Sequence, residues 1–554
     1  MSSQVEILET AIKAAIGRAI SSGEISGATP AAITLERPKN RAHGDYATSV
    51  ALQLAKSAGK SPRDVAQIII DYLQSVDEIS KLEIAGPGFI NITLNRASQA
   101  KLVGKILESG KNFGHSNLLN GVRINLEFIS ANPTGPLHLG HTRWAAVGDA
   151  LGRVLSAAGA EVTREFYIND RGNQMDLFGA SIEASALGKA IPENGYQGDY
   201  IVDLAKEILE VDPTITLLPE GDRLIAFREA AYVLQLKDQK RTLDNFGTHF
   251  DIWFSERSLH DQGAVEHGVE KLRAKGHVFD LEGAVWLRTT DFGDDKDRVL
   301  IKSDGSLTYF SSDTAYYINK RERGFDICIY MLGADHHGYV GRLKATAACA
   351  GDNPEYNIHV LIGQLVKIME AGQEVKLSKR AGTIITLEEL VAKIGVDAAR
   401  YTLIRYPVDT PMVMDIDILK RNTNENPVYY VQYAHARIAA VLRNAVELKI
   451  PLDVDSFDSS ELIHDRENEL LGALAQFPRV LATAAELRQP HRISRYLEDL
   501  AGTYHSFYAD CRVLPMGEEN PSPLHTARLL LCSATRTVIA NGLDLLGVSA
   551  PERM

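Results

Sequence analysis

Two short motifs far apart in the sequence constrain the fold of this chain more than any other feature. Residues 136–141 read Pro-Leu-His-Leu-Gly-His, and residues 376–380 read Lys-Leu-Ser-Lys-Arg. The first motif follows residues 123–128, which alternate like a half-buried strand, and a turn rich in Gly, Pro and Asn. Apolar residues then recur at helical spacing from Thr142, and residues 161–168 read as the next strand. The first motif is therefore predicted to lie where a strand turns into a helix, within a βαβ unit.

The two histidines of the first motif, His138 and His141, are suited to binding a phosphate group. A helix N-terminus presents unpaired N–H groups and the positive end of the helix dipole, so it attracts anions. Because the histidines are three residues apart, both rings can face one side of the first turn. Each can then donate a hydrogen bond to an oxygen of the pentacoordinate phosphoryl group, while Gly140 lets a nucleotide approach the backbone. The alternative is a capping histidine beside a core helix.

The second motif places two lysines, Lys376 and Lys379, on either side of Ser378. It follows the apolar residues 358–369, which predict one buried strand. Compact ammonium charges on a loop suit the neutralisation of a leaving pyrophosphate. An ordinary solvated basic loop is the alternative for this motif alone, and the presence of the histidine motif favours phosphate binding.

Together the two motifs resemble the HIGH and KMSKS signatures of class I aminoacyl-tRNA synthetases. Four further segments give a narrower resemblance, to arginyl-tRNA synthetases of the bacterial type. They are residues 127–136, 332–339, 395–400 and 542–554. The resemblance covers essentially the whole chain. One departure is Arg380, which stands where KMSKS has its final serine.

The resemblance implies an α/β fold class with a Rossmann-like parallel-sheet catalytic domain, an N-terminal α/β domain and a C-terminal α-helical bundle. Helical spacing from residue 424 onward agrees with the bundle. We expect an N-terminal tRNA-contacting α/β domain at 1–115, a catalytic domain at 116–375 with an insertion at about 190–295, a KMSKS-like loop and connecting segment at 376–423, and an α-helical anticodon-binding domain at 424–554.

The activity that the resemblance implies is ATP-dependent activation of L-arginine to arginyl-adenylate, followed by transfer of the arginyl group to tRNA(Arg). The family needs tRNA present before it activates the amino acid. No covalent enzyme intermediate is required, so catalysis depends on positioning and charge stabilisation. The implied catalytic residues are His138, His141, Lys376 and Lys379. The implied ATP-binding residues are these four with Gly140, Gly333, His336 and Ser378.

Recognition of arginine requires buried carboxylates, because a planar guanidinium favours bidentate pairing. The resemblance assigns arginine binding to Glu127, Ser130, Asn132, Tyr309, Asp313 and His336. In this assignment Asp313 and Glu127 pair with the guanidinium, and Tyr309 packs alongside. Ser130 and Asn132 hold the α-amino and carboxylate groups. Asp313 has an alternative or additional role as a helix cap, because residues 311–314 (Ser-Ser-Asp-Thr) could begin a helix.

The formal net charge of −13 is unusual for an RNA-binding protein, because phosphate backbones require positive charge at the contact. An acidic total only requires that the basic patch be local. One such patch lies at residues 37–46, and the resemblance implies that it contacts the tRNA elbow. Its candidate residues are Arg37, Lys39, Arg41 and Tyr46. The alternative is a solvated turn in a small α/β domain.

The predicted C-terminal bundle carries a second group of candidate tRNA contacts. Tyr430, Tyr433 and Arg437 fall on one helical face, where two rings and a guanidinium could stack on unstacked anticodon bases. Aromatic residues at helical spacing also form protein cores, so the alternative is an interior position.

Composition excludes several other classes of protein. With 45% hydrophobic and 24% charged residues, the 554-residue chain fits a globular protein of several domains. Its four cysteines are scattered and form no Cys-x-x-Cys, so we expect neither a disulfide framework nor zinc. No apolar stretch is long enough to span a membrane, and the N-terminal residues do not resemble a signal peptide. We expect a cytoplasmic monomer without a prosthetic group, to which ATP brings Mg²⁺.

Three alternative functions stay open. A class I synthetase for another amino acid would share both motifs, because side-chain specificity is the property least determined by sequence. A pantothenate-synthetase-like ligase would share the motifs but lack the helical C-terminal third. A non-enzymatic tRNA-binding paralogue would be expected to lack a histidine or lysine of the motifs, and none is missing. Residues 335–337 (Asp-His-His) also resemble a metal cluster, but no nearby acidic cluster completes such a site.

Overall fold

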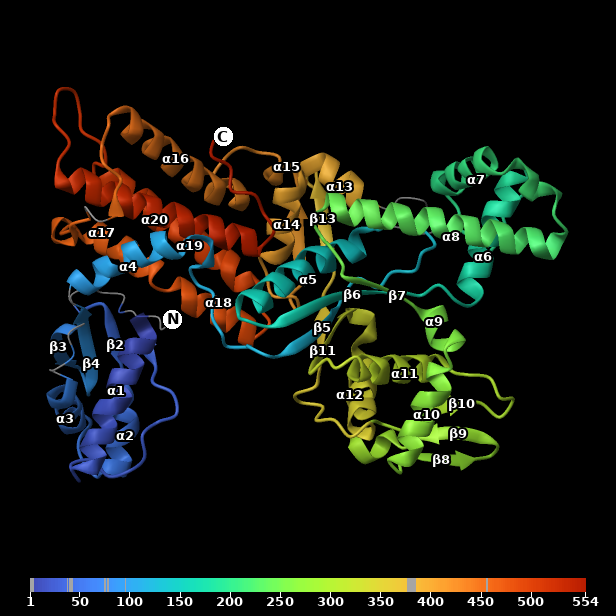
Figure 1. The fold of residues 1–554 in the computed structure, drawn as a ribbon, viewed down its shortest axis with the longest axis horizontal. Helices are drawn as coiled ribbons and strands as arrows, with labels where there is room; N and C mark the ends of the chain where they lie inside the picture. The colour runs from blue at the N-terminus through green and yellow to red at the C-terminus, as the bar shows by residue number, and fades with distance from the viewer. Residues whose placement is uncertain are drawn as a thin grey trace.

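The computed structural model describes residues 4–36, 38, 43–73, 76, 79–94, 96–375, 385–454 and 457–554. Figure 1 shows an elongated arrangement, with the C-terminal helices along the upper left and the N-terminal part below one end of them. The parallel sheet lies below their other end, and helices α6, α7 and α8 extend away on the far side from the N-terminal part.

The middle of the molecule is a five-stranded parallel sheet with the order β12-β11-β5-β6-β7. Its strands are β5 (Arg123–Glu127), β6 (Glu161–Ile168), β7 (Ile252–Ser255), β11 (Ile327–Gly333) and β12 (Ile358–Gly363). Their apolar runs are typical of a sheet that is covered on both faces. Helix α5 (Leu139–Ala157) connects β5 to β6 and packs into the same hydrophobic cluster. The predicted α/β fold class and βαβ unit are thereby confirmed.

The strand order places a topological switch point between β5 and β11. The chain runs outward from β5 to β7 and then returns to β11 on the other side of β5. Glu127 of β5 lies in register with Tyr330 of β11 and with Glu165 of β6. Doubly wound folds bind ligands in the crevice at the carboxyl ends of the strands beside such a point. We therefore expect the two motifs to lie at this edge of the sheet.

The apolar residues 358–369 form two strands rather than the single strand that their sequence predicts. The second of these, β13, belongs to a separate sheet with β14 and β15. These elements are β13 (Val366–Glu370), β14 (Gln373–Glu374) and β15 (Met412–Asp415). The chain leaves the first sheet at Gln364, whose N–H donates to the Val408 carbonyl at 2.8 Å. The Gln364 carbonyl accepts a hydrogen bond from Arg143 of α5 at 3.0 Å, so two long-range bonds interrupt the apolar run.

The N-terminal part forms an α/β unit around its own hydrophobic cluster. Its antiparallel sheet has the order β1-β2-β4-β3. The elements are α1 (Gln4–Ser21), β1 (Leu35–Glu36), β2 (Tyr46–Thr48), α2 (Val50–Ala58), α3 (Pro62–Leu73), β3 (Ile79–Ala85) and β4 (Phe89–Leu94), followed by α4 (Arg96–Ser109). Tyr46 is 2% exposed within this cluster, because alternate residues of β2 face the core. It therefore does not present the exposed ring that its sequence context predicted.

Helices and a small antiparallel sheet lie between β6 and β11. They are α6 (Asn173–Ala186), α7 (Asp199–Val211), α8 (Glu220–Asn245), α9 (Glu256–Asp261), α10 (Ala264–Ala274), β8 (Val278–Leu281), β9 (Ala284–Leu287), β10 (Arg298–Ile301) and α11 (Tyr309–Glu322). Strand β7 pairs with β6 although it lies inside the stretch of about 190–295 that we predict to be an insertion. We therefore propose an insertion that is interrupted by one strand of the parallel sheet.

The chain beyond β11 is mostly helical. Its helices are α12 (Val340–Cys349), α13 (Leu387–Ile394), α14 (Val396–Ile404), α15 (Ile416–Leu419), α16 (Pro427–Glu447), α17 (Asp465–Leu474), α18 (Phe477–Glu486), α19 (His491–Asp510) and α20 (Pro523–Leu545). One continuous hydrophobic cluster joins α16 to α20 with the parallel sheet. Within the described ranges, every helix is too short or too polar to traverse a bilayer.

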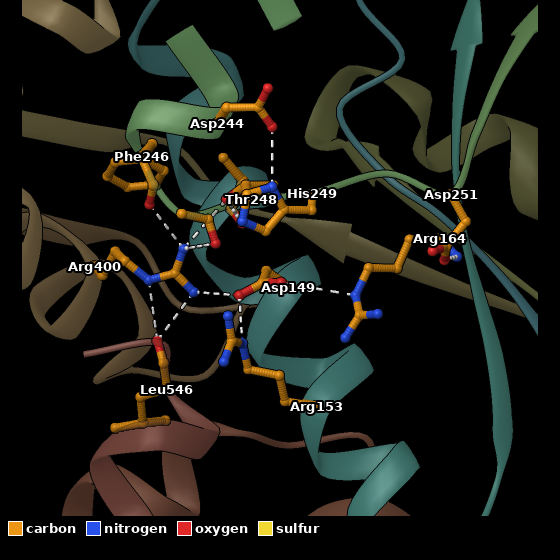
Figure 2. A network of polar contacts seen from close by, with 12 residues as sticks. Asp149, Arg153, Arg164, Asp244, Phe246, Thr248, His249, Asp251, Arg400 and Leu546 are labelled. Carbon is orange, nitrogen blue, oxygen red and sulfur yellow. Dashed lines mark hydrogen bonds and ion pairs between the residues drawn. The ribbon is translucent and has the colours of Figure 1, made fainter. Parts of the chain in front are cut away.

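A buried ion pair joins the C-terminal helices to α5 (Figure 2). The Arg400 guanidinium of α14 is 0% exposed and donates to the Asp149 carboxylate of α5 at 2.5 Å. Arg153 and Arg164 also contact this carboxylate, at 2.8 and 3.7 Å. Arg400 further donates to backbone carbonyls, including that of Leu546 at 3.1 Å. Residues 395–400 and 542–554, two of the segments that carry the family resemblance, therefore meet at α5, the helix of the histidine motif.

Replacing Arg400 with Met should lower the free energy of unfolding by about 3–5 kcal/mol, because Asp149 then stays buried without its closest partner. The matched control is Arg405→Met, which breaks a half-buried pair with Glu498 (2.8 Å) and should cost about 1 kcal/mol. Urea denaturation followed by circular dichroism measures both. Equal losses for the two variants would contradict the special position of Arg400.

Candidate active site

The histidine motif forms the N-terminus of α5, at the carboxyl end of β5. His138 is the N-cap residue, and its Nδ1 accepts a hydrogen bond from the Gly140 N–H at 3.1 Å. The His138 N–H donates in turn to Nδ1 of His141 at 3.4 Å. The two half-buried rings lie 4.0 Å apart between centroids. Because Nδ1 is the acceptor in both rings, each neutral imidazole carries its proton on Nε2 and is a donor there.

Gly140 is required by the packing of His138. A Cβ at this position would lie 2.9 Å from Cε1 of the His138 ring, closer than ordinary contact allows. The capping geometry of His138 and the small size of Gly140 therefore depend on each other. Capping and phosphate binding do not exclude each other here, because only Nδ1 of His138 is used by the cap.

Residues 376–384 lie outside the described residues, so the structure places none of Lys376, Ser378, Lys379 or Arg380. The residues that follow them are placed, and they pair with the histidine motif. The Leu139 N–H donates to the Ile385 carbonyl at 3.1 Å, and the Leu387 N–H donates to the Leu137 carbonyl at 2.9 Å. The chain that leaves the second motif is thus hydrogen-bonded to the backbone of the first.

A strained turn follows β5. Ile129 and Ser130 have φ angles of 70° and 45°, which are uncommon for residues other than glycine and most unfavourable for a β-branched side chain. Such strain persists only where surrounding contacts fix the backbone. Here the Ser130 hydroxyl donates to Glu127 at 2.9 Å and accepts from the Tyr167 N–H at 3.3 Å. Asn132, at the end of the turn, is half-buried and donates to the side chain of Gln174.

Glu127, which supports this turn, is paired within the protein. Its carboxylate accepts from Lys320 of α11 at 2.5 Å. The Lys320 ammonium is 0% exposed and lies 4.3 and 3.8 Å from the ring centroids of Tyr316 and Tyr330. The negative charge of Glu127 is therefore already compensated without a ligand.

Asp313 lies in the second turn of α11 and does not cap it. The helix begins at Tyr309, and Thr308 is the N-cap, accepting from the Ser311 N–H at 3.3 Å. The capping role that residues 311–314 suggested is therefore wrong. The Asp313 carboxylate accepts from the Tyr339 hydroxyl, and burial raises its pKa to about 6.

A second carboxylate near Asp313 was not found by sequence reasoning. Glu256 is the first residue of α9, directly after β7, and it is 6% exposed. Burial, the nearby charge of Asp313 and other neighbours raise its pKa to about 7, although the Tyr167 hydroxyl donates to it. Its neighbour Arg171 contacts the His260 ring at 3.0 Å instead. Neither carboxylate forms an ion pair with a lysine or arginine in the part of the chain that the structure describes.

The remaining predicted residues of this site lie around the same edge. Tyr309 is 80% exposed at the start of α11, and Gly333 is the last residue of β11. His336 follows in a 3-10 turn, is exposed, and lies 3.5 Å from the Asp335 carboxylate. Among the described residues, no group of three or more His, Cys, Asp or Glu side chains is arranged to hold a metal ion.

The predicted tRNA-contacting residues lie elsewhere. Arg37, Lys39 and Arg41 fall outside the described residues. Tyr430, Tyr433 and Arg437 are half-buried on α16, and both tyrosine rings contact the His505 ring of α19. The Arg437 guanidinium lies 5.3 Å from the Tyr433 ring and 4.8 Å from the Tyr508 ring. These residues form one aromatic and basic cluster between two helices.

Comparison with known proteins places the whole chain. Residues 6–94 match the arginyl tRNA synthetase N terminal domain, 102–435 the catalytic domain of class I tRNA synthetases (R), and 431–554 the DALR anticodon binding domain. An arginine–tRNA ligase of Frankia alni is 54% identical over 547 residues, covering 99% of both chains. That of Pseudarthrobacter chlorophenolicus is 55% identical over 555 residues, covering 99% of this chain and 100% of its own.

A solved structure agrees at the level of the fold. The Thermus thermophilus arginyl-tRNA synthetase superposes with a TM-score of 0.75 at 22% identity, covering 99% of this chain and 100% of that chain. The family models and the relatives at 54% and 55% identity, which are aligned over nearly their full length, indicate the same family. This chain belongs to the arginyl-tRNA synthetases, within the class I aminoacyl-tRNA synthetases.

Proposed function

We propose how this chain, as an arginine–tRNA ligase, uses the site at the carboxyl edge of its parallel sheet. In the first step the arginine carboxylate attacks the α-phosphorus of ATP and pyrophosphate leaves. In the second step the terminal adenosine hydroxyl of tRNA(Arg) attacks the activated carbonyl and AMP leaves. The observation that carries the proposal is the position of Glu256 and Asp313, a buried and a half-buried carboxylate, neither of which forms an ion pair with a lysine or arginine among the described residues.

The phosphate side of the site is the N-terminus of α5. Nε2 donors of His138 and His141 would stabilise the α-phosphate as its charge grows, and the positive end of the helix dipole would add to this effect. Gly333 and His336, at the end of β11, would contact the adenosine across the switch point. ATP arrives as its Mg²⁺ complex, in which phosphate oxygens and water supply most ligands of the ion.

The second motif would act on the β- and γ-phosphates. The structure does not place Lys376, Ser378 and Lys379, and the proposal for them rests on the sequence. It is supported by Ile385, which follows the motif and is hydrogen-bonded to Leu139 of α5. Lys376 and Lys379 precede Ile385 closely in the sequence, so their ammonium groups would lie near phosphates bound at the helix N-terminus.

The arginine side of the site would use Asp313 and Glu256 for the guanidinium, with Tyr309 packing alongside. Glu256 takes the place that the sequence suggested for Glu127, because Glu127 already pairs with Lys320. Glu127 would act through Ser130, whose strained backbone it holds by a hydrogen bond. Ser130 and Asn132 would then bind the α-amino and carboxylate groups.

Binding of tRNA would involve both ends of the chain. The cluster of Tyr430, Tyr433 and Arg437 offers rings and a guanidinium to anticodon bases. Arg37, Lys39 and Arg41 keep their sequence-based assignment to the tRNA elbow, and Tyr46 does so only as a buried support. We also propose domain boundaries at residues 115, 375 and 423, a cytoplasmic location and a monomeric state.

Replacing His138 or His141 with Ala should slow adenylate formation roughly 10²- to 10³-fold, as when one transition-state donor is removed. Arginine-dependent ATP–pyrophosphate exchange in the presence of tRNA(Arg) measures this rate. His267→Ala is the matched control, because His267 is exposed on α10 and pairs with Glu322. Near-normal exchange by either motif variant would refute the assigned role.

The KM for arginine should rise as the pH falls from 8 towards 6. The pKa values of Glu256 and Asp313 are raised to about 7 and about 6, so over this range Glu256 becomes mostly protonated and Asp313 begins to be protonated. A protonated carboxyl no longer attracts the guanidinium cation, and each group can cost up to about tenfold per pH unit below its pKa. The Glu256→Gln variant should raise the arginine KM and lose the upper part of this dependence. An arginine KM that is flat with pH, or a parallel change in the ATP KM, would contradict the assignment.

A further inference from the structure

A cavity of about 610 Å³ lies between the N-terminal part and the C-terminal helices. One wall comes from β1 and β2, through Leu35, Glu36 and Tyr46. The other comes from α18 and the first half of α19, two helices that Figure 1 shows above the N-terminal part. The cavity is far from the carboxyl edge of the parallel sheet, so the proposed chemistry does not use it.

Three arginines give this cavity a positive charge. Arg479 of α18 donates to the Leu35 carbonyl at 3.2 Å, and Arg492 of α19 donates to the Gln489 side-chain oxygen at 2.7 Å. Neutral acceptors orient a guanidinium without cancelling its charge. Arg495 lies one helical turn after Arg492, and all three line the cavity. None of the three forms an ion pair with any residue in the described ranges.

The other titratable groups around the cavity oppose this charge only in part. Glu36 and Asp499 also line it, and burial raises the pKa of Asp499 although Arg495 acts in the opposite direction. Burial, with Arg492 as the next cause, lowers the pKa of His491, which is therefore neutral at pH 7. Three guanidinium groups thus face two carboxylates, in a chain whose formal net charge is −13. The N-terminus of α19 adds the positive end of a helix dipole.

We propose that this cavity binds phosphate groups of the tRNA backbone. Guanidinium groups match the geometry of phosphate oxygens, and phosphate contacts fix the orientation of an RNA without reading its sequence. The two walls belong to the segments that match the N-terminal domain and the anticodon binding domain of the family. An RNA that binds both segments must pass the cavity that lies between them. The inference rests on the proposed function, which supplies tRNA as the ligand. It adds a contact to the tRNA backbone at a place between the tRNA elbow and the anticodon.

The test is the double variant Arg492→Gln/Arg495→Gln, which removes two charges and keeps polar side chains. We expect the Kd for tRNA(Arg) to rise about tenfold at 0.1 M salt, and the slope of log Kd against log salt concentration to fall by about 1–2. The matched control is Lys206→Gln/Lys237→Gln, which removes two exposed charges from α7 and α8 at positions that do not line the cavity. The control should keep the wild-type Kd and slope.

Two results would overturn the inference: an unchanged Kd and slope for the arginine variant, or an equal loss in the control. If the double variant unfolds, Arg479→Gln alone supplies the same comparison, because Arg479 is exposed. Failure of the proposed function is separate. A wild-type chain that does not charge tRNA(Arg) refutes the function. Normal charging by the arginine variant, with a wild-type KM for tRNA, refutes only this site.

Discussion

The interior of this enzyme is organised by the requirement that buried charges have partners. Removing an ion from water costs several kcal/mol even after the protein relaxes. Lys320 pairs with Glu127, Arg323 with Glu165 and Arg400 with Asp149, each at 2.5 Å. These pairs join β5, β6, α5, α11 and α14, so the strands that carry the site and the helices around them are held in one arrangement. The pair of Arg400 and Asp149 also fixes the end of α20 against α5 through the Leu546 carbonyl.

Glu256 and Asp313 are the exceptions, and the proposed function assigns the arginine guanidinium to them. Both are placed by regular elements, Glu256 at the start of α9 and Asp313 in the second turn of α11, and burial is the main cause that raises the pKa of each. An arginine guanidinium bound beside them would gain the attraction of two poorly solvated carboxylates, and it would lower the cost of keeping them ionised. The protein supplies partners for its structural charges, and the arginine substrate would supply the partner for this pair. The strained turn at Ile129 and Ser130 also depends on a buried ion pair, because Glu127, which pairs with Lys320, accepts the hydrogen bond of the Ser130 hydroxyl.

Much of the fold could be predicted because its signals are local. The alternation of residues 123–128, the helical spacing after Thr142 and the motif at 136–141 predicted β5, α5 and the position of both histidines. Features set by long-range pairing could not be predicted this way. Gln364 leaves its strand because of bonds to Val408 and Arg143, which no local pattern shows. Glu256 becomes a site residue only once β7 is placed beside β6, and Tyr46 lies in a strand of three residues, too short for its alternation to be recognised.

The proposed function implies that Glu256 and Asp313 select the amino acid by the positive charge of its side chain. The most direct measurement compares arginine with citrulline in ATP–pyrophosphate exchange, with tRNA(Arg) present in both reactions. Citrulline has nearly the same shape, but a neutral urea group replaces its guanidinium. We expect kcat/KM for citrulline to be lower by about 10³-fold or more, because Glu256 and Asp313 would be left without a cation. Exchange with citrulline at a rate close to that with arginine would contradict it.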